Sequence, residues 1–184
     1  MFANDTEHGL LFTAVLVNTM DGEALPDTAA LDALAREWGW TGRRERTQAE
    51  LEAVRALRPK LRRFWELDED GIVRLANGLL REGGALPQLV KHDEWGYHIH
   101  ATPSEAPLAI RMSVESAMAF VDLVRGGELA RLRICEFEGC DNVVIDLSKN
   151  HSKRFCDSGC GNRAAVAAYR ARKRRVLSGK KAKK

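Results

Sequence analysis

Residues 131–163 read RLRICEFEGCDNVVIDLSKNHSKRFCDSGCGNR, and they hold all four cysteines of the 184-residue chain. The cysteine spacing is Cys135-x4-Cys140-x15-Cys156-x3-Cys160. Two close pairs separated by a spacer of this length are typical of a tetrahedral zinc site, because each short turn supplies two thiolates. We therefore predict one structural Zn²⁺ held by these four residues. Four protein ligands fill the tetrahedron and leave no open position for a catalytic water.

Three other readings of the cysteines stay open at this level. Disulfides are disfavoured because nothing marks the chain as secreted, and cytosolic thiols stay reduced. A zinc site that releases its metal on oxidation is compatible with the sequence, since thiolates are the form that oxidises. His151 could replace one cysteine as a ligand.

The residues around the cysteines predict a small zinc-dependent module. The NVVIDL segment at 142–147 is expected to form one arm of a hairpin, with Arg154 and Phe155 on the other arm. Cys156 and Cys160 are four residues apart at the start of a helix, where they share one face and the helix dipole favours thiolates. This order predicts a treble-clef-like zinc finger that carries a long basic helix.

The last helix combines five alanines between 164 and 171 with many cations. At 100° per residue, Arg163, Arg170 and Arg174 fall within about 20° of one line. Such a stripe on a zinc-supported helix suits phosphate neutralisation and guanine recognition, although a merely solubilising face is the simpler alternative. Val166, Tyr169 and Val176 are expected to pack against the zinc hairpin. The predicted DNA-binding residues are Arg163, Arg170, Arg172, Lys173, Arg174 and Arg175.

The formal net charge of +3 conceals two unlike regions. Residues 1–130 carry a balance of −7 and residues 131–184 a balance of +10. Charge asymmetry of this kind suggests modules with different partners. We predict a domain at 1–130 that senses a signal or dimerises, a zinc finger at 131–178 and a basic disordered tail at 179–184.

The first domain is predicted to be α+β, mainly helical with a small sheet. The apolar run LLFTAVLVNTM at 10–20 indicates a buried strand. Helix signals follow: N-caps at Asp27 or Thr28, a capping box of Thr47 with Glu50, a kink or division at Pro59 and a candidate cap at Ser104. The expected helices begin near 27, 48, 72 and 106, and the expected strands are 86–91 and 95–101, joined by a turn at 92–94.

Two groups in this domain could bind a ligand. His98 and His100 point to one face of a predicted strand and could ligate a metal, but no third ligand is fixed nearby, so surface or core roles are favoured. Trp38, Trp40, Trp65 or Trp95 could line a small-molecule pocket, which sequence cannot distinguish from core. No nucleotide-binding loop, nucleophile elbow or metalloprotease pattern occurs, so we expect no enzymatic activity.

The zinc region resembles the CGNR zinc finger family. Cys160-Gly161-Asn162-Arg163 is its signature, and the patterns RLRIC, GC and D-x-S-x-N-x-S-x-R-x-C precede it. Phe155 stands where the family commonly has Trp, and an aromatic there should keep the packing role. Residues 1–130 look like the ABATE-type domain that accompanies this finger in bacterial proteins described as stress-induced transcription regulators, a looser match that rests on Asn18-Thr19 and the helix order.

The resemblance implies zinc ligation by the four cysteines and a transcription regulator that binds duplex DNA in promoter regions. An RNA- or ribosome-associated protein with the same basic module is the alternative. A homodimer and a small-molecule effector are compatible partners. No apolar run is long enough for a membrane helix and the N-terminus lacks signal-peptide features, so we expect a cytoplasmic, nucleoid-associated protein.

Overall fold

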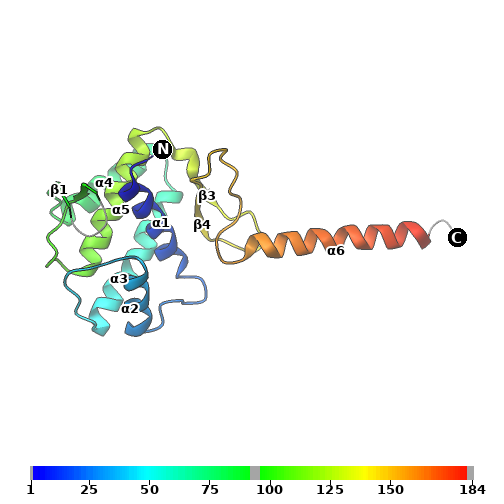
Figure 1. The fold of residues 1–184 in the computed structure, drawn as a ribbon, viewed down its shortest axis with the longest axis horizontal. Helices are drawn as coiled ribbons and strands as arrows, with labels where there is room; N and C mark the ends of the chain where they lie inside the picture. The colour runs from blue at the N-terminus through cyan, green and yellow to red at the C-terminus, as the bar shows by residue number, and fades with distance from the viewer. Residues whose placement is uncertain (1, 92–95, 182–184) are drawn as a thin grey trace.

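The computed structural model describes residues 2–91 and 96–181, with side chains as far as Arg174. Helices α1–α5 form a body, β3 and β4 lie beside it, and α6 projects away from it (Figure 1). The helices are α1 (Asn4–Asn18), α2 (Thr28–Glu37), α3 (Gln48–Arg62), α4 (Glu69–Glu82), α5 (Leu108–Arg125) and α6 (Cys160–Lys181). The strands are β1 (Gln88–Val90), β2 (His98–His100), β3 (Leu132–Ile134) and β4 (Val143–Ile145), and two 3-10 turns are η1 (Arg63–Trp65) and η2 (Leu129–Arg131).

The predicted strand at 10–20 is wrong, because this run lies in α1 and in the turn that follows it. Leu10, Phe12 and Leu16 are almost wholly buried. The helix packs against α5, α3 and β4, so several of its faces are apolar rather than one. A continuous apolar run carries no periodicity, and periodicity is the signal that separates a buried helix from a buried strand.

Two of the predicted helix starts are confirmed by their caps. The Asp27 carboxylate accepts a hydrogen bond from Ala30 N–H at 2.8 Å, and the Thr47 hydroxyl accepts one from Glu50 N–H at 3.2 Å. The capping box is only half formed, because the Glu50 carboxylate accepts from the N–H of Arg46 at 3.0 Å instead of returning to Thr47.

Pro59 does not divide α3, which runs unbroken past it. A proline leaves the carbonyl four residues earlier without its helical donor. The guanidinium Nε of Arg58 donates to that carbonyl, Arg55 O, at 3.3 Å. Side-chain compensation therefore lets the helix continue.

The remaining helices agree with prediction except at their starts. The helix expected from 72 begins at Glu69, after Asp68 accepts from Gly71 N–H at 2.9 Å. The helix expected near 106 begins at Leu108, and Ser104 does not cap it, because the cap position is Pro107.

One hydrophobic core runs through the body and continues into β4. At its centre the rings of Phe64 and Phe120 stack with centroids 3.8 Å apart. Val143 and Ile145 of β4 are buried in the same cluster. The region predicted as a separate zinc finger thus shares its apolar core with the preceding domain.

The structure contains two small antiparallel sheets in the described residues. β1 pairs with β2 with Leu89 opposite Ile99, which confirms the predicted sheet. The predicted turn at 92–94 and Trp95 lie outside the described residues.

The second sheet pairs β4 with β3, with Val144 opposite Arg133. The expected partner of the NVVIDL segment, Arg154 and Phe155, is wrong. The carbonyl of Arg154 instead accepts a hydrogen bond from the N–H of Glu136, the residue after Cys135, at 2.9 Å. The local pattern does not distinguish the two segments as partners of β4, and the structure pairs β4 with β3.

Across the part of the chain that is described, none of the helices combines the length and apolar character needed to cross a bilayer.

Candidate metal centre and basic helix

The four cysteine sulfur atoms lie within 4.8 Å of one another. The Cys140–Cys156 and Cys156–Cys160 sulfur pairs are 3.8 and 3.5 Å apart. Zinc bound by four thiolates at about 2.3 Å requires sulfur atoms roughly 3.8 Å apart. Cys135, Cys156 and Cys160 are buried, and all four thiols are free of disulfides. The cluster therefore fits one structural Zn²⁺, as the spacing predicts.

Each cysteine pair is closed by a glycine in a left-handed conformation. Gly139 has φ of 76° directly before Cys140, and Gly159 has φ of 78° directly before Cys160. A side chain would be strained at such a φ, so glycine allows each turn to bring its second cysteine back to its first. Cys160 is also the first residue of α6, which joins the metal centre directly to the basic helix.

The protein environment favours one thiolate before metal binds. Burial acts to raise the pKa of the Cys156 thiol, but hydrogen bonds from Ser158 N–H, Asn142 and Cys160 outweigh it and lower the pKa to about 6. Burial raises the pKa of the Cys140 thiol to about 12. A metal ion would displace the remaining protons, because a thiol that binds zinc is deprotonated.

Arg163, the last residue of the signature, contacts the metal centre. Its guanidinium donates to Cys160 Sγ at 2.8 Å and lies 4.8 Å from the ring centroid of Phe137. Four thiolates around Zn²⁺ carry a net charge of −2, which a neighbouring cation stabilises. Sequence reasoning assigned Arg163 to DNA and missed this contact. Its position three residues after Cys160, on the same helical face, was the available signal.

Asn142 connects the metal centre to the body. Its side-chain amide donates to Cys156 Sγ at 3.6 Å and to Asp21 Oδ2 at 3.4 Å, beyond the end of α1. Asn142 is buried, whereas its place in the NVVIDL segment predicts only a residue of a strand arm. The residue thus orients one ligand while it holds the loop against the first domain.

Asp146 organises the loop between the cysteine pairs. Its fully buried carboxylate accepts from Ser148 N–H at 3.0 Å and from Lys153 N–H at 2.9 Å. Burial acts to raise its pKa, but these hydrogen bonds and Arg133 outweigh burial and lower it. The D-x-S pattern noted in the sequence therefore forms a loop-closing hydrogen-bond network.

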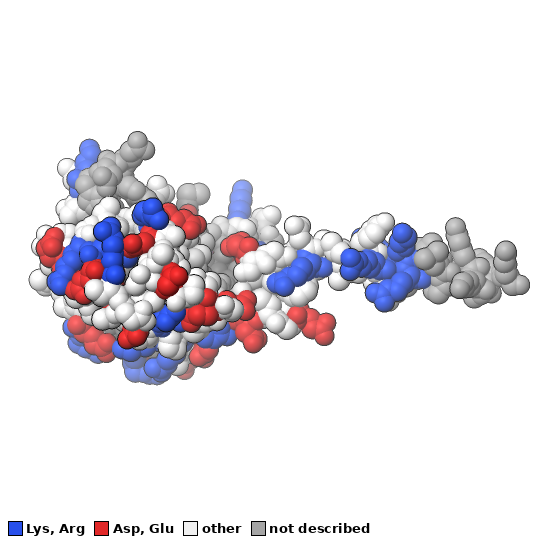
Figure 2. All heavy atoms as spheres, turned by 90° about the horizontal axis from the view of Figure 1, so that it is seen from below, with Lys and Arg blue, Asp and Glu red and all other residues white. Residues whose placement is uncertain are grey.

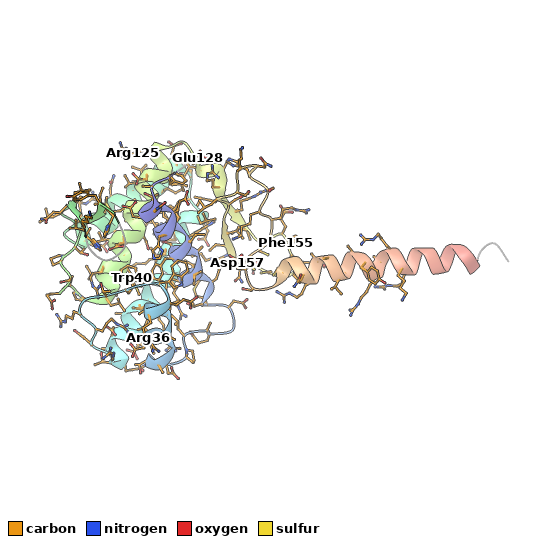
Figure 3. All side chains as sticks on the ribbon, in the orientation of Figure 1. Arg36, Trp40, Arg125, Glu128, Phe155 and Asp157 are labelled. Carbon is orange, nitrogen blue, oxygen red and sulfur yellow. The ribbon has the colours of Figure 1, made fainter. Side chains whose placement is uncertain are left out.

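His151 does not replace a cysteine among the described residues. Its Nε2 lies 4.0 Å from a Glu128 carboxylate oxygen, and the metal-ligating group consists of the four cysteines. Phe155 does keep the expected packing role, because it packs with Phe137 against the buried cysteines. Figure 3 labels Phe155 and Asp157 where the chain enters α6.

The zinc hairpin is fixed to the body by hydrogen bonds as well as by the core. Asn18 bonds both backbone groups of Val143, accepting from N–H at 2.8 Å and donating to the carbonyl at 2.9 Å. The Trp65 indole donates to Val144 O at 3.1 Å, and Arg62 donates to Asp141 O at 2.9 Å. These contacts fix the position of the hairpin relative to α1 and η1.

Beyond its first turn, the basic helix α6 is solvent-exposed as far as its side chains are described. From Ala165 to Arg174 every side chain is exposed. Val166 and Tyr169 are 47% and 59% exposed, so the expectation that they pack against the hairpin is wrong, and the side chain of Val176 lies outside the described residues. After Asp157 the chain contains no further acidic residue, and from Arg163 onward it has ten Lys and Arg residues.

Five of the predicted DNA-binding side chains are exposed on this helix: Arg163, Arg170, Arg172, Lys173 and Arg174. Figure 2 shows these cations along the projecting helix, whereas acidic and basic side chains are mixed over the visible face of the body. Arg175 lies on α6, but its side chain is outside the described residues. The helix runs to Lys181, so residues 179–181 are helical rather than a disordered tail, and 182–184 lie outside the description.

The candidate tryptophans do not form one pocket. Trp38 and Trp40 both pack against Phe12, whereas Trp65 packs on Phe120. Among the described residues, the indole nitrogens of Trp38 and Trp40 are buried without a hydrogen-bond partner. Trp95 is not described. His98 and His100 share one face of β2, as expected, far along the chain from the cysteines.

Comparison with protein families agrees with this division of the molecule. The CGNR zinc finger family model matches residues 131–173. The ABATE family model, described as "Putative stress-induced transcription regulator", matches residues 13–127. A search of curated proteins finds no match. Because the ABATE model covers more than half of the sequence, the chain belongs to the ABATE family, and it carries a CGNR zinc finger after the ABATE region.

Proposed function

We propose that the chain is a zinc-dependent regulator that binds duplex DNA through α6. The observation that carries the proposal is the helix itself. It starts at a zinc ligand, projects away from the body (Figure 1) and carries no acidic residue. Its cations from Arg163 to Arg174 are exposed. A helix that carries only positive side chains, and is held at one end by a metal centre, favours binding to a polyanion.

The dimensions of α6 suit the major groove. A helix of 22 residues is about 33 Å long. The major groove of B-DNA admits an α-helix, and Arg can neutralise phosphates or bind guanine edges there. The DNA contacts are assigned to Arg170, Arg172, Lys173, Arg174 and Arg175, because Arg163 is engaged with Cys160. The order of Cys turn, hairpin and helix supports a treble-clef-like finger.

The body would supply regulation rather than catalysis. A hollow of about 460 Å³ lies where α1 meets the zinc module, with Val15, Trp38, Val144 and Ser158 among its lining residues. An effector in this hollow would contact both the helical body and the zinc module. Dimerisation through the body is the other way in which it could regulate α6. The filled zinc tetrahedron has no position for substrate, which favours a binding protein over an enzyme.

Binding of the zinc-loaded chain to promoter fragments at several salt concentrations tests the proposal. We expect Arg170→Ala with Arg174→Ala to weaken binding and to reduce the slope of log K against log salt by about 1.8, since each lost phosphate contact contributes about 0.9. A matched control removes two exposed cations of the body, Lys60→Ala with Arg125→Ala, whose side chains are 57% and 78% exposed.

Two results would contradict the proposal. One is the absence of DNA binding at low salt with zinc loaded, and the other is an equal slope change in the body control. Competition between duplex DNA and structured RNA separates the preferred function from the RNA-associated alternative, because an A-form major groove is too deep and narrow for side chains to read.

A further inference from the structure

Two large apolar side chains, Val166 and Tyr169, lie exposed side by side on α6. They are 47% and 59% exposed, and neither belongs to a hydrophobic cluster among the described residues. Residues three apart are neighbours on the surface of a helix, so the two form one patch. An exposed apolar patch with charged residues around it is typical of a surface that contacts a partner.

The residues around α6 are sorted by size. At about 100° per residue, four side chains fall within about 60° of one another, and they form what we call the Val166 face: Asn162, Val166, Tyr169 and Lys173. The alanines at 164, 167, 168 and 171 are centred on the opposite side of the helix. Because alanine is small, the side chains that can reach into a partner lie on the Val166 face and on its flanks.

Exposed arginines flank the Val166 face on both sides. Arg170 lies about 70° from the middle of the face in one direction, and Arg172 lies about 90° from it in the other. A second copy of α6 would bring only like charges against them, because the helix has no acidic residue, and this repulsion disfavours pairing through the face. The pattern instead fits a groove with phosphates along both edges and with apolar and polar groups on its floor.

On the basis of the proposed function, we propose that Val166 and Tyr169 contact thymine methyl groups in the major groove, with Arg170 and Arg172 on the phosphates of the two strands. The thymine C5-methyl is an apolar group at the major-groove edge, and apolar side chains recognise it there. The Tyr169 ring supplies apolar area, and its hydroxyl can donate or accept a hydrogen bond at a base edge. The exposure of this patch is thus explained by the DNA that covers it.

The ends of the Val166 face define the length of the DNA site. From Asn162 to Lys173 the helix rises by about 17 Å, which is roughly the length of five base pairs. The Asn162 amide suits the edge of adenine, and the Lys173 ammonium suits the edge of guanine. The expected site is therefore short, with at least one thymine opposite the middle of the face.

The test removes the thymine methyl group from the DNA. Duplexes selected from a random pool by the zinc-loaded full chain are made with thymine or with uracil, which lacks only the methyl group. We expect the uracil duplex to bind about three- to tenfold more weakly in fluorescence anisotropy titrations, because burial of each methyl group is favourable. The slope of log K against log salt should be equal for the two duplexes, since their phosphates are identical.

A matched set of variants assigns the preference to the Val166 face. Val166→Ala with Tyr169→Ala should abolish the preference for thymine over uracil and leave the salt slope unchanged. Alanine is the strongest helix former, so the variant keeps α6, which far-UV circular dichroism checks. Adding Ala168→Val returns a valine to the opposite side of the helix and should not restore the preference.

The outcomes separate this inference from the proposed function. Equal affinity for the two duplexes, with DNA binding and its salt slope retained, would overturn the inference alone, whereas absence of DNA binding would overturn both. A preference that survives in the double variant, or that Ala168→Val restores, would also overturn the inference. If the double variant keeps the preference but loses a dimer in analytical ultracentrifugation, the partner of the Val166 face is a second copy instead.

Discussion

The two halves of the zinc finger differ sharply in their surroundings. Val143, Val144 and Ile145 of β4 are at most 2% exposed, whereas Val166 and Tyr169 of α6 are about half exposed. The hairpin half belongs to the core of the body, and the helix half leaves the body at Cys160. A single metal centre thus joins a buried element to an exposed one, and it can set the direction of the helix because the hairpin is already fixed.

This difference also separates the sources of stability. The hairpin gains free energy from apolar burial and from hydrogen bonds to Asn18 and Trp65. Between Ala165 and Arg174 the side chains of α6 are all exposed, so this part of the helix depends on its own propensity. That propensity is high for an alanine-rich segment but marginal for an isolated helix in water. Metal removal should therefore affect the two halves unequally.

The largest effect should follow from removal of zinc. Zinc binding contributes on the order of 10 kcal/mol in small zinc modules, so chelation should release the loop at 147–159 and detach α6. The body and β4 should persist because they share an apolar core. Hydrogen exchange measures this as protection lost at 147–159 and kept in β4, α1 and α5, with Cys140→Ser as the genetic equivalent. Equal loss of protection in the body would show that the hairpin half depends on zinc as much as the helix half does.

The second effect tests whether the hairpin is part of the body. Ile145→Ala should reduce the free energy of unfolding by about 2–5 kcal/mol, because the side chain is 2% exposed in the core shared with α1. Two controls sharpen the comparison: Ile134→Ala on the paired strand, 40% exposed, and Val166→Ala on α6, for which we expect less than about 0.5 kcal/mol. Urea denaturation of the body helices provides the measurement. An effect of Ile145→Ala no larger than that of Val166→Ala would mean that the hairpin folds separately.

The third effect concerns the junction between the halves. Arg163→Ala should lower zinc affinity by about tenfold to a hundredfold, because it removes the cation that donates to Cys160 Sγ. Arg170→Ala removes an equal charge from the same helix without any such contact, and it should leave zinc affinity unchanged while weakening DNA binding. Competition with a chromophoric chelator measures the zinc affinity of each variant. Identical zinc affinities in the two variants would show that Arg163 acts only through general charge.

The smallest effect is a pH dependence in the loop of the hairpin half. Asp146 has a pKa held below its usual value, so its stabilisation is present above the unfolded pKa near 3.9 and is lost as pH falls through the folded value. Asp146→Asn should cost about 1 kcal/mol near neutral pH and remove this part of the acid dependence. Thermal melts of both chains from neutral to acidic pH measure the difference. Curves that stay parallel down to pH 3 would contradict the assignment.

The sequence by itself determined the features that depend on local chemistry. Cysteine spacing identified all four members of the metal-ligating group. Capping residues located the starts of helices such as α2 and α3, and alanine content predicted α6. Each of these signals acts within a few residues along the chain, so a linear pattern carries it.

Only the tertiary structure decided what lies against what. The apolar run at 10–20 belongs to a helix because α1 is surrounded by α3, α5 and β4, and burial on several faces removes the period that would reveal it. The partner of β4 and the exposure of Val166 depend on packing between segments that are apart in sequence. The contact of Arg163 with Cys160 is local to α6, but only the structure shows that the guanidinium turns toward the sulfur. Residue types limit such contacts, but the choice among them is made by the shared core and by the geometry of the metal centre.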